Sequence, residues 1–510
     1  MSLNLFDLSA FVGFFAIVIG ISLYKSREEK TSEDYFLAGR GLGLWLIGFS
    51  LIASNISTEQ LVGMAGQGFG REGMAVAGYE WFAAVTLVFS ALFLLPKFLK
   101  CGIFTIPEFL EYRYNSASRM LMAIFMMIMY VAVTLPSILY SGALLLDTTF
   151  GMNLFQAVWL IGIIAGVYTI YGGLKAVVWT DLFQGAALLI GGFIVMILGF
   201  KAVGGVSAFL DTNADKLHVI LPADHPEIPW TALILGLWIP NIFYWGLNQF
   251  IVQRTLGAKS IQEGQKGIML AASIKLLMPF IIVFPGIMAF QIYADQITNN
   301  DQAYPTLIRE ILPSGLRGVL FAAIFGAILS SLDSMLNSAS TIFTMDLYKR
   351  HLKPEASHRN LVKIGRFSTA VFVLVSCMIA PLLANPRFGG VFKYIQMFQG
   401  FVSPGIVTVF LFGLIVRKAP PVAAISAMLG NVVIYGLLLW TLPQVAFLNH
   451  MAITFLALVF LMAIITIWKP LAQPVKMPVR EEIDVKTGGG IKSLGILIIA
   501  ATIALYVIFW

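Results

Sequence analysis

The chain is poor in charged residues. Only 12% of its 510 residues are Asp, Glu, Lys or Arg, whereas a soluble globular protein carries roughly 25%. Hydrophobic residues make up 59% of the sequence. This composition excludes an ordinary soluble domain and is typical of a polytopic helical membrane protein.

Cysteine and histidine are also scarce. The two cysteines, Cys101 and Cys377, fall in a charged loop and in an apolar segment, which excludes a disulfide framework. The five histidines show no metal-ligand spacing, and no nucleophile–base pair is visible, so we do not expect an enzyme. No lysine or arginine precedes Lys25 and no small-residue cleavage site is present, so the first apolar stretch is predicted to be an uncleaved span.

Apolar segments long enough to cross a bilayer recur along the whole chain. A membrane helix needs about 20 apolar residues, and fourteen segments are of spanning length. They cover residues 5–24, 42–69, 73–98, 117–147, 152–171, 177–200, 229–253, 267–293, 314–346, 361–384, 389–416, 420–441, 449–468 and 491–510. The predicted fold class is therefore an all-α polytopic membrane protein with fourteen transmembrane helices.

Positive charge is distributed unevenly between the loops that join these segments. With the N-terminus outside, about three quarters of the 33 lysines and arginines fall in inner loops, and this bias predicts that both termini lie outside. The inner charges account for the net charge of +7, so we expect no nucleic-acid partner. No obligatory protein partner is evident. The predicted location is the plasma membrane, or the inner membrane if the source is a bacterium.

Two of the predicted spans are interrupted near the middle of the bilayer. The span 42–69 turns polar at Ser54 to Ser57, and the span 229–253 is expected to break around Pro240 and Asn241. Non-helical backbone at that depth is tolerated only where it is buried in protein or lines a cavity, and transporters use it to hold ions and solutes. Because the interrupted spans are the second and the seventh, five places apart in the order of spans, they cross the membrane in opposite directions, as in an inverted repeat.

Polar side chains inside the spans indicate what such a cavity would bind. Lys275 stands alone in an apolar run and needs a partner, for which Glu80 is the expected carboxylate. Amide groups come from Gln60, Asn241 and Gln396. This mixture of donors and acceptors suits a neutral polyhydroxylated solute. Hydrogen bonding between helices is the alternative role for these residues.

Aromatic residues directly follow the second expected break. Tyr244 and Trp245 offer flat rings that would pack against a pyranose and close the site. Packing against neighbouring helices is the alternative role for these two rings, and this alternative has more weight for Trp245 than for Tyr244. No arginine is expected deep in the membrane at this site, which disfavours a carboxylated substrate.

One further span carries a polar helix face. Ser330, Asp333, Ser334 and Asn337 share this face by their spacing of three and four residues. Hydroxyl and carbonyl oxygens in such a setting are ligands for a hard cation. Serine hydroxyls that bond back to their own helix are the alternative.

Four motifs give the chain a family resemblance. They are Ala53-Ser-Asn-Ile-Ser-Thr-Glu-Gln60, Tyr171-Gly-Gly-Leu-Lys-Ala-Val-Val-Trp-Thr-Asp181, Tyr244-Trp-Gly-Leu-Asn-Gln-Phe-Ile-Val-Gln-Arg254 and Ser330-Ser-Leu-Asp-Ser-Met-Leu-Asn-Ser338. In these motifs the chain resembles the solute–sodium symporter family, and within it the sodium/glucose and sodium/galactose cotransporters. The resemblance implies two inverted five-helix repeats, here residues 41–200 and 229–416. Around them would lie an N-terminal helix and inner loop (1–40), an outer loop (201–228) and C-terminal flanking helices (417–510).

The resemblance also implies roles for single residues. It assigns sodium to the backbone carbonyls of Ala53, Ile56 and Ala327 and to the hydroxyls of Ser330 and Ser331. It assigns sugar contacts to Gln60, Glu80, Asn241, Lys275 and Gln396, with Tyr244 as the inner gate beside Phe243 and Trp245. Asp181 matches a position associated with sodium passage on the inner side.

Three positions depart from the family pattern. Phe243 and Ala83 stand where close members have Tyr and Ser, which removes two hydroxyls near the sugar. Asp333 adds a carboxylate where those members have a small residue. Together with Asp181, Ser330 and Ser334, it would build a second sodium site, which some members possess.

These features together predict a sodium-driven symporter that imports a neutral monosaccharide, similar to glucose or galactose, by alternating access. Its expected partners are sodium, the sugar and the lipid bilayer. A symporter for myo-inositol, sialic acid or proline is an alternative on the same scaffold. A sugar sensor or uniporter is the alternative from a different functional class.

Overall fold

The protein is helical throughout the part of the chain that the structure describes. This structure, a computed structural model, describes residues 37–479 and 487–510 apart from 172–173 and 314, with a few residues before position 25. Within these ranges the sheet-like pairings are two isolated bridges, Leu42–Ala258 and Leu221–Pro229. Most of the predicted first span, residues 5–24, lies outside the described residues.

The described residues contain ten helical stretches that are long and apolar enough to cross a membrane. These are Gly73–Cys101, Ser116–Phe150, Val178–Ala202, Trp230–Leu247, Ile261–Tyr293, Leu316–Leu352, His358–Ala384, Pro421–Thr441, Phe447–Trp468 and Gly489–Ile508. An eleventh forms if α21 (Val391–Gln399) and α22 (Ser403–Ile415), bent by 43°, count as one span. Each coincides with a predicted span. The count is below fourteen because the predicted span 42–69 is split, 152–171 holds a shorter apolar helix, and 5–24 is mostly outside the described residues.

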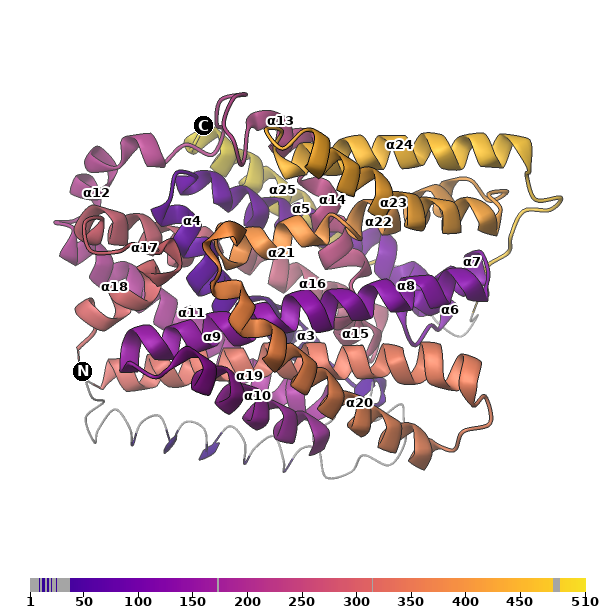
Figure 1. The fold of residues 1–510 in the computed structure, drawn as a ribbon, viewed down its shortest axis with the longest axis horizontal. Helices are drawn as coiled ribbons and strands as arrows, with labels where there is room; N and C mark the ends of the chain where they lie inside the picture. Colours follow the sequence, from indigo (N-terminus) through magenta and orange to yellow (C-terminus); the bar gives the residue numbers. More distant parts are fainter. Residues whose placement is uncertain are drawn as a thin grey trace.

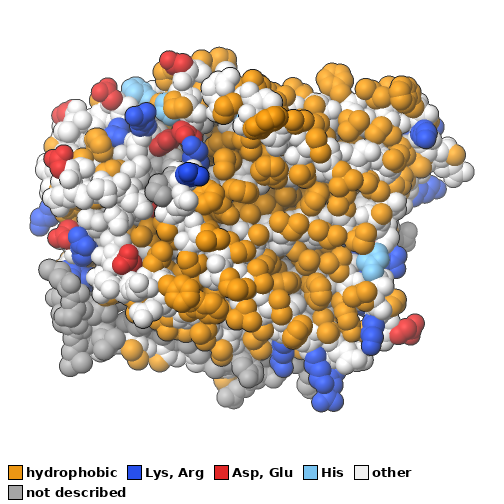
Figure 2. Space-filling view, in the orientation of Figure 1, with side chains coloured by type: hydrophobic (Ala, Val, Ile, Leu, Met, Phe, Trp, Pro, Cys, Tyr) orange, Lys and Arg blue, Asp and Glu red, His pale blue; other side chains and the backbone are white. Residues whose placement is uncertain are grey.

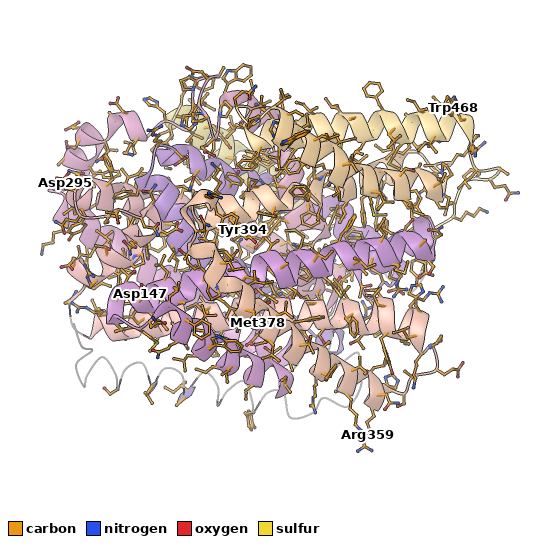
Figure 3. The ribbon with its side chains drawn as sticks, in the orientation of Figure 1. Asp147, Asp295, Arg359, Met378, Tyr394 and Trp468 are labelled. Carbon is orange, nitrogen blue, oxygen red and sulfur yellow. The ribbon has the colours of Figure 1, made fainter. Side chains whose placement is uncertain are left out.

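The helices run mostly along the long axis of the molecule, as α24 (Phe447–Trp468) and α19 (Leu316–Ile342) show in Figure 1. On the face shown in Figure 2, hydrophobic side chains cover the middle and charged side chains gather toward the two ends. An apolar band between polar ends is what a bilayer requires of a spanning protein. In Figure 3, Asp147 and Asp295 lie at one end and Arg359 and Trp468 at the other, in agreement with the predicted alternation of loops.

The predicted interruption of the first broken span is confirmed. Helix α3 (Leu44–Asn55) ends at Asn55, and Ile56 leaves helical geometry with ψ of 84°. The chain resumes as a π-helical turn, η2 (Glu59–Met64), followed by α4 (Ala65–Phe69). Side chains of Ser and Asn compete with the helical backbone for hydrogen bonds, which favours such a stop. α3 packs mainly against α16 (Ile261–Lys275) and α11 (Leu174–Ala202), and Leu51 to Asn55 are buried.

The second broken span is interrupted at other places than expected. The predicted break at Pro240 and Asn241 is wrong, because both residues lie within α14 (Trp238–Ile242). Pro240 is near the start of this helix, where its missing N–H leaves no intrahelical bond unmade. The interruptions lie on either side: at Gly236, after α13 (Trp230–Leu235), and at Asn248, whose ψ of 122° separates η7 (Phe243–Leu247) from α15 (Gln249–Leu256).

Glycine allows some of these helices to touch backbone to backbone. In α17 (Met278–Tyr293), a Cβ atom added to Gly286 would lie 2.1 Å from the carbonyl oxygen of Ala65 in α4. Small residues of this kind are what membrane helices use to approach closely. The position of α4, just after the interrupted helix, therefore depends on Gly286.

We predict that Gly286→Ala destabilises the protein by about 1–3 kcal/mol, because α4 and α17 must separate to accept the methyl group. The measurement is the thermal unfolding midpoint in detergent. Gly430→Ala is the matched control, since its Cβ would meet a Leu458 side-chain carbon at an ordinary 3.4 Å. Unfolding midpoints that are equal for Gly286→Ala and the wild type would contradict this packing.

Candidate functional site

A cavity of about 40 Å³ lies beside the interruption of α3. It is lined by Asn55, Gln60, Tyr79, Glu80, Pro240, Asn241, Tyr244, Trp245, Phe392, Gln396 and Gln399. This volume holds only a few water molecules, so binding of a larger solute requires the lining side chains to move apart. The sequence-predicted residues that line it are Gln60, Glu80, Asn241, Tyr244, Trp245 and Gln396. Phe243 and Lys275 are buried but are not lining residues.

A buried ion pair stands behind one wall of the cavity. Lys275 pairs with Glu80, as the sequence predicted, and also donates a hydrogen bond to the side-chain oxygen of Asn55. The Lys275 ammonium lies 4.8 Å from the centroid of the Trp245 ring, a cation–π contact. The ammonium contacts all three groups, and its positive charge balances the Glu80 carboxylate. The cavity wall therefore carries no net charge at this place, although Glu80 lines it.

Aromatic side chains bound the cavity. The Tyr244 hydroxyl accepts a hydrogen bond from the Asn55 side-chain amide at 3.0 Å, and its ring meets Trp245 edge to face. Tyr79 and Phe392 form a second edge-to-face pair, with ring centroids 5.1 Å apart. The rings therefore offer apolar faces, while the tyrosine that was predicted as a gate is held to the interrupted helix.

The amides leave hydrogen-bonding capacity for a solute. The Gln60 side-chain oxygen is buried and has no hydrogen-bond partner among the described residues. A buried acceptor without a partner costs about 1–3 kcal/mol. Asn241 donates to the Leu237 carbonyl at 3.0 Å, which fixes its orientation. Gln399, which sequence reasoning missed, donates to the Pro240 carbonyl at 3.2 Å; its spacing of three residues from Gln396 on one helix was the available signal.

A loop carboxylate positions the helix that carries Phe392, Gln396 and Gln399. Asp301, in η8 (Asn300–Gln302), accepts a hydrogen bond from the Val391 backbone N–H at 3.0 Å and so caps α21. The turn before this helix uses Gly390 at φ +98°. Burial raises the pKa of Asp301 to about 6, although the bond from Val391 opposes that rise. Sequence reasoning missed Asp301 because it lies outside every predicted span.

The interruption of α3 also releases backbone carbonyls on its other side. The Ser57 N–H donates to the Asn55 carbonyl at 3.0 Å instead of to Ala53, four residues back. The Gln60 N–H donates to Ser57 at 3.1 Å instead of to Ile56. Carbonyls freed in this way are the ion ligands of broken membrane helices.

Helix α19 approaches these carbonyls. The Ser331 hydroxyl donates to the Ser54 carbonyl at 3.3 Å, which joins α19 to the interrupted segment. Ala327 lies one turn earlier in α19 and is fully buried. The Ser330 hydroxyl instead donates to Asp181 in α11. Of the five predicted sodium ligands, Ile56 thus lies in the break and Ala53 in the turn before it. Ser331 contacts the segment from α19, whereas the Ser330 hydroxyl is bonded to Asp181.

Asp181 is the centre of a second buried cluster, and its cation is Arg254. The two side chains form an ion pair with Nη2 and Oδ2 3.3 Å apart, and both are buried. Arg254 also donates to the hydroxyls of Ser50, at 2.5 Å, and of Ser334. The expectation that no arginine lies within the membrane core is wrong. The chain changes direction at Asn248, before α15, and this places the Arg254 side chain between α3, α11 and α19.

The four residues of the predicted second sodium site have different hydrogen-bond partners in this arrangement. Asp181 and Ser334 share the Arg254 guanidinium, while Ser330 bonds to the other oxygen of Asp181. Asp333 accepts a hydrogen bond from Thr169, and its second oxygen has no hydrogen-bond partner among the described residues. The guanidinium is therefore in contact with two of the four predicted ligands.

The family model of the Sodium:solute symporter family matches residues 35–431. The chain belongs to this family. It is a sodium-coupled solute symporter and a multi-pass integral membrane protein, not an enzyme, and Na⁺ is its co-transported ion rather than a cofactor.

Individual relatives support this assignment. The symporter is 40% identical to a sodium/glucose cotransporter of Vibrio parahaemolyticus over 100% of its own length and 99% of that protein. It is 33% identical to sodium/myo-inositol cotransporter 2 of Mus musculus, covering 85% of this chain and 69% of the relative. A solved structure of a Na⁺-coupled sialic acid symporter shares the fold, with a TM-score of 0.82, 23% identity, and coverage of 93% of this chain and 100% of that one.

We predict that Arg254→Ala lowers the unfolding free energy of the symporter by about 3–5 kcal/mol, because it leaves Asp181 buried without a counter-charge. The double variant Arg254→Gln/Asp181→Asn should recover much of this loss. A double-mutant cycle on thermal unfolding in detergent measures the coupling. The exposed pair Arg309–Glu310, 2.8 Å apart, is the control and should show coupling below about 1 kcal/mol. Equal coupling in the two pairs would contradict the buried cluster.

Proposed function

We propose that this symporter imports a neutral monosaccharide, similar to glucose or galactose, together with sodium by alternating access. The observation that carries this proposal is the cavity beside the α3 break, in which amide groups and aromatic rings surround a carboxylate already neutralised by Lys275. Such a wall offers hydrogen-bond donors and acceptors without a net charge, which favours a polyol over an ion. The sodium/glucose cotransporter of Vibrio parahaemolyticus, similar over the full length, supports the same substrate class.

The same cavity wall distinguishes between the alternative substrates. A sialic acid carries a carboxylate and calls for a basic partner, but Lys275 and Arg254 are both committed to buried acids. Myo-inositol is a neutral ring with hydroxyls, and the mouse relative named for it is 33% identical. It is therefore the second candidate substrate of this symporter.

We place sodium at the carbonyls of Ala53, Ile56 and Ala327 and the hydroxyls of Ser330 and Ser331. The rerouted N–H groups of Ser57 and Gln60 and the contact of Ser331 with the α3 segment support this placement. Sodium bound there would hold α3 against α19 and favour the outward-open state. Loss of sodium to the cell interior would then release the sugar.

The driving force follows from the charge on the ion. One Na⁺ moving down 100 mV contributes about 2.3 kcal/mol, and a tenfold sodium gradient adds about 1.4 kcal/mol. Their sum supports roughly 500-fold accumulation of sugar. In this proposal the two inverted repeats, residues 41–200 and 229–416, move relative to each other, and both termini lie outside.

The first test is uptake of radiolabelled glucose, galactose, myo-inositol, proline and sialic acid by proteoliposomes with and without a sodium gradient. We predict sodium-dependent accumulation of a hexose. Accumulation of proline or sialic acid without any hexose would overturn the substrate class, and uptake that ignores sodium would favour a uniporter.

Two variants test the residues in the same assay. We predict that Gln60→Ala weakens hexose affinity about tenfold, because it removes the amide oxygen left for a solute hydroxyl, whereas Gln156→Ala, on an exposed helix face, leaves it unchanged. Ser331→Ala should raise the sodium concentration for half-maximal uptake. Wild-type sodium dependence in Ser331→Ala would count against the ion placement.

The second sodium site at Asp181, Ser330, Asp333 and Ser334 is tested by stoichiometry. Because Arg254 contacts Asp181 and Ser334, sodium can bind there only in a state in which the guanidinium has moved away. We predict two sodium ions per sugar from reversal potentials of the wild type and one in Asp333→Asn. A stoichiometry of one in the wild type, or of two in the variant, would remove this site.

A further inference from the structure

A second and larger cavity lies at the end of the molecule away from Asp147 and Asp295. It measures about 550 Å³ and lies among α6 (Leu95–Cys101), α7 (Ile106–Arg113), the end of α22 and the segment 473–479. α6 and α7 are at the right-hand end of Figure 1, the same end as Trp468 in Figure 3. The proposed sugar and sodium sites use none of its residues.

Hydrogen bonds build this cavity into the fold. The segment after α24 is joined to the loop after α22, because Leu471 and Val475 donate their N–H groups to the carbonyls of Lys418 and Arg417 at 3.0 and 3.2 Å. Arg113 is buried and donates to three carbonyls at the end of α22, those of Gly413, Val416 and Ala419. One wall is therefore fixed to both α7 and α22.

The cavity is rimmed by positive charge. Lys97, Lys100, Arg417 and Lys476 line it, and no Asp or Glu is among its described lining residues. No described carboxylate lies within ion-pair distance of these four side chains. Elsewhere at this end, Arg119 and Arg350 are both paired with Glu111. Four cations around one cavity, none paired with a carboxylate among the described residues, favour an anionic ligand.

The floor of the cavity is apolar. We use this term for the apolar part of the lining, which includes Phe109, Leu414, Val475, Met477 and Val479. Phe109 is held in place by stacking on Phe410, with ring centroids 5.3 Å apart. A free inorganic anion gains nothing from such a floor, whereas a ligand with a charged head and a hydrocarbon chain uses both parts. Basic pockets between helices at the cytoplasmic side of membrane proteins bind lipid headgroups in this way.

We propose that this cavity binds an anionic phospholipid. The phosphate-bearing headgroup lies among Lys97, Lys100, Arg417 and Lys476, and an acyl chain follows the floor at Phe109 and Leu414. The positive charges of the inner loops place this end at the cytoplasmic leaflet in the predicted orientation. The lipid ties the segment 473–479 to α6 and α22.

The test measures lipid binding to the full-length symporter in detergent by native mass spectrometry. We expect diacyl phosphatidylglycerol to bind more tightly than phosphatidylcholine with the same chains. Lys97→Gln/Lys100→Gln should weaken phosphatidylglycerol binding about 25-fold, about fivefold for each lysine. Lys353→Gln/Lys363→Gln, which removes two exposed lysines elsewhere in the inner loops, should retain the wild-type affinity. Lys97→Arg/Lys100→Arg keeps the charge and should also bind as the wild type does.

Four results would overturn the proposal. The first is equal binding of the two lipids, and the second is an equal loss of affinity in the Lys353→Gln/Lys363→Gln control. The third is competition by millimolar inorganic phosphate that displaces phosphatidylglycerol, which would identify a free-anion site. Loss of binding in the Lys97→Arg/Lys100→Arg variant would show that folding, not charge, was affected, and would also contradict it.

Discussion

The interruption of α3 at Ile56 and Ser57 is the constraint on which the rest of the site depends. A helix that stops inside a bilayer exposes carbonyl and amide groups that lipid cannot satisfy. Here the surrounding helices provide the partners: α19 contributes the Ser331 hydroxyl, and α16 contributes Lys275 to Asn55 at the last turn of the helix. Polar groups at the break are therefore bonded to side chains of the neighbouring helices.

The buried charges next to the binding sites are also neutralised beside α3. Two buried ion pairs are attached to α3, since Lys275 bonds to Asn55 and Arg254 bonds to Ser50. One pair stands behind the cavity that we propose for the sugar, and the other lies beside the Ser54 hydroxyl, which approaches Asp181 at 3.5 Å. A shift of α3 therefore changes the surroundings of both pairs at once. This gives a short physical route between the ion site and the solute site that we propose.

Some of this site could be predicted from the sequence and some could not, for identifiable reasons. Lys275 is alone in an apolar run, so its need for Glu80 was evident from the sequence alone. Arg254 directly follows the predicted span 229–253, so the sequence predicts that it lies in a loop. Only the turn at Asn248 brings it into the core. The break expected at Pro240 failed because a proline in the first turn of a helix costs no hydrogen bond. Asp301 acts from a loop distant in sequence, a contact that hydropathy does not encode.

The most direct test of coupling through α3 is equilibrium binding of sodium and of the transported sugar, each measured by titration calorimetry with and without a saturating amount of the other. Thermodynamic linkage requires the two enhancement factors to be equal. We predict that the sugar strengthens sodium binding by the same factor, above fivefold, by which sodium strengthens sugar binding. Sodium affinity that is unchanged by saturating sugar would contradict a shared interrupted helix as the source of coupling.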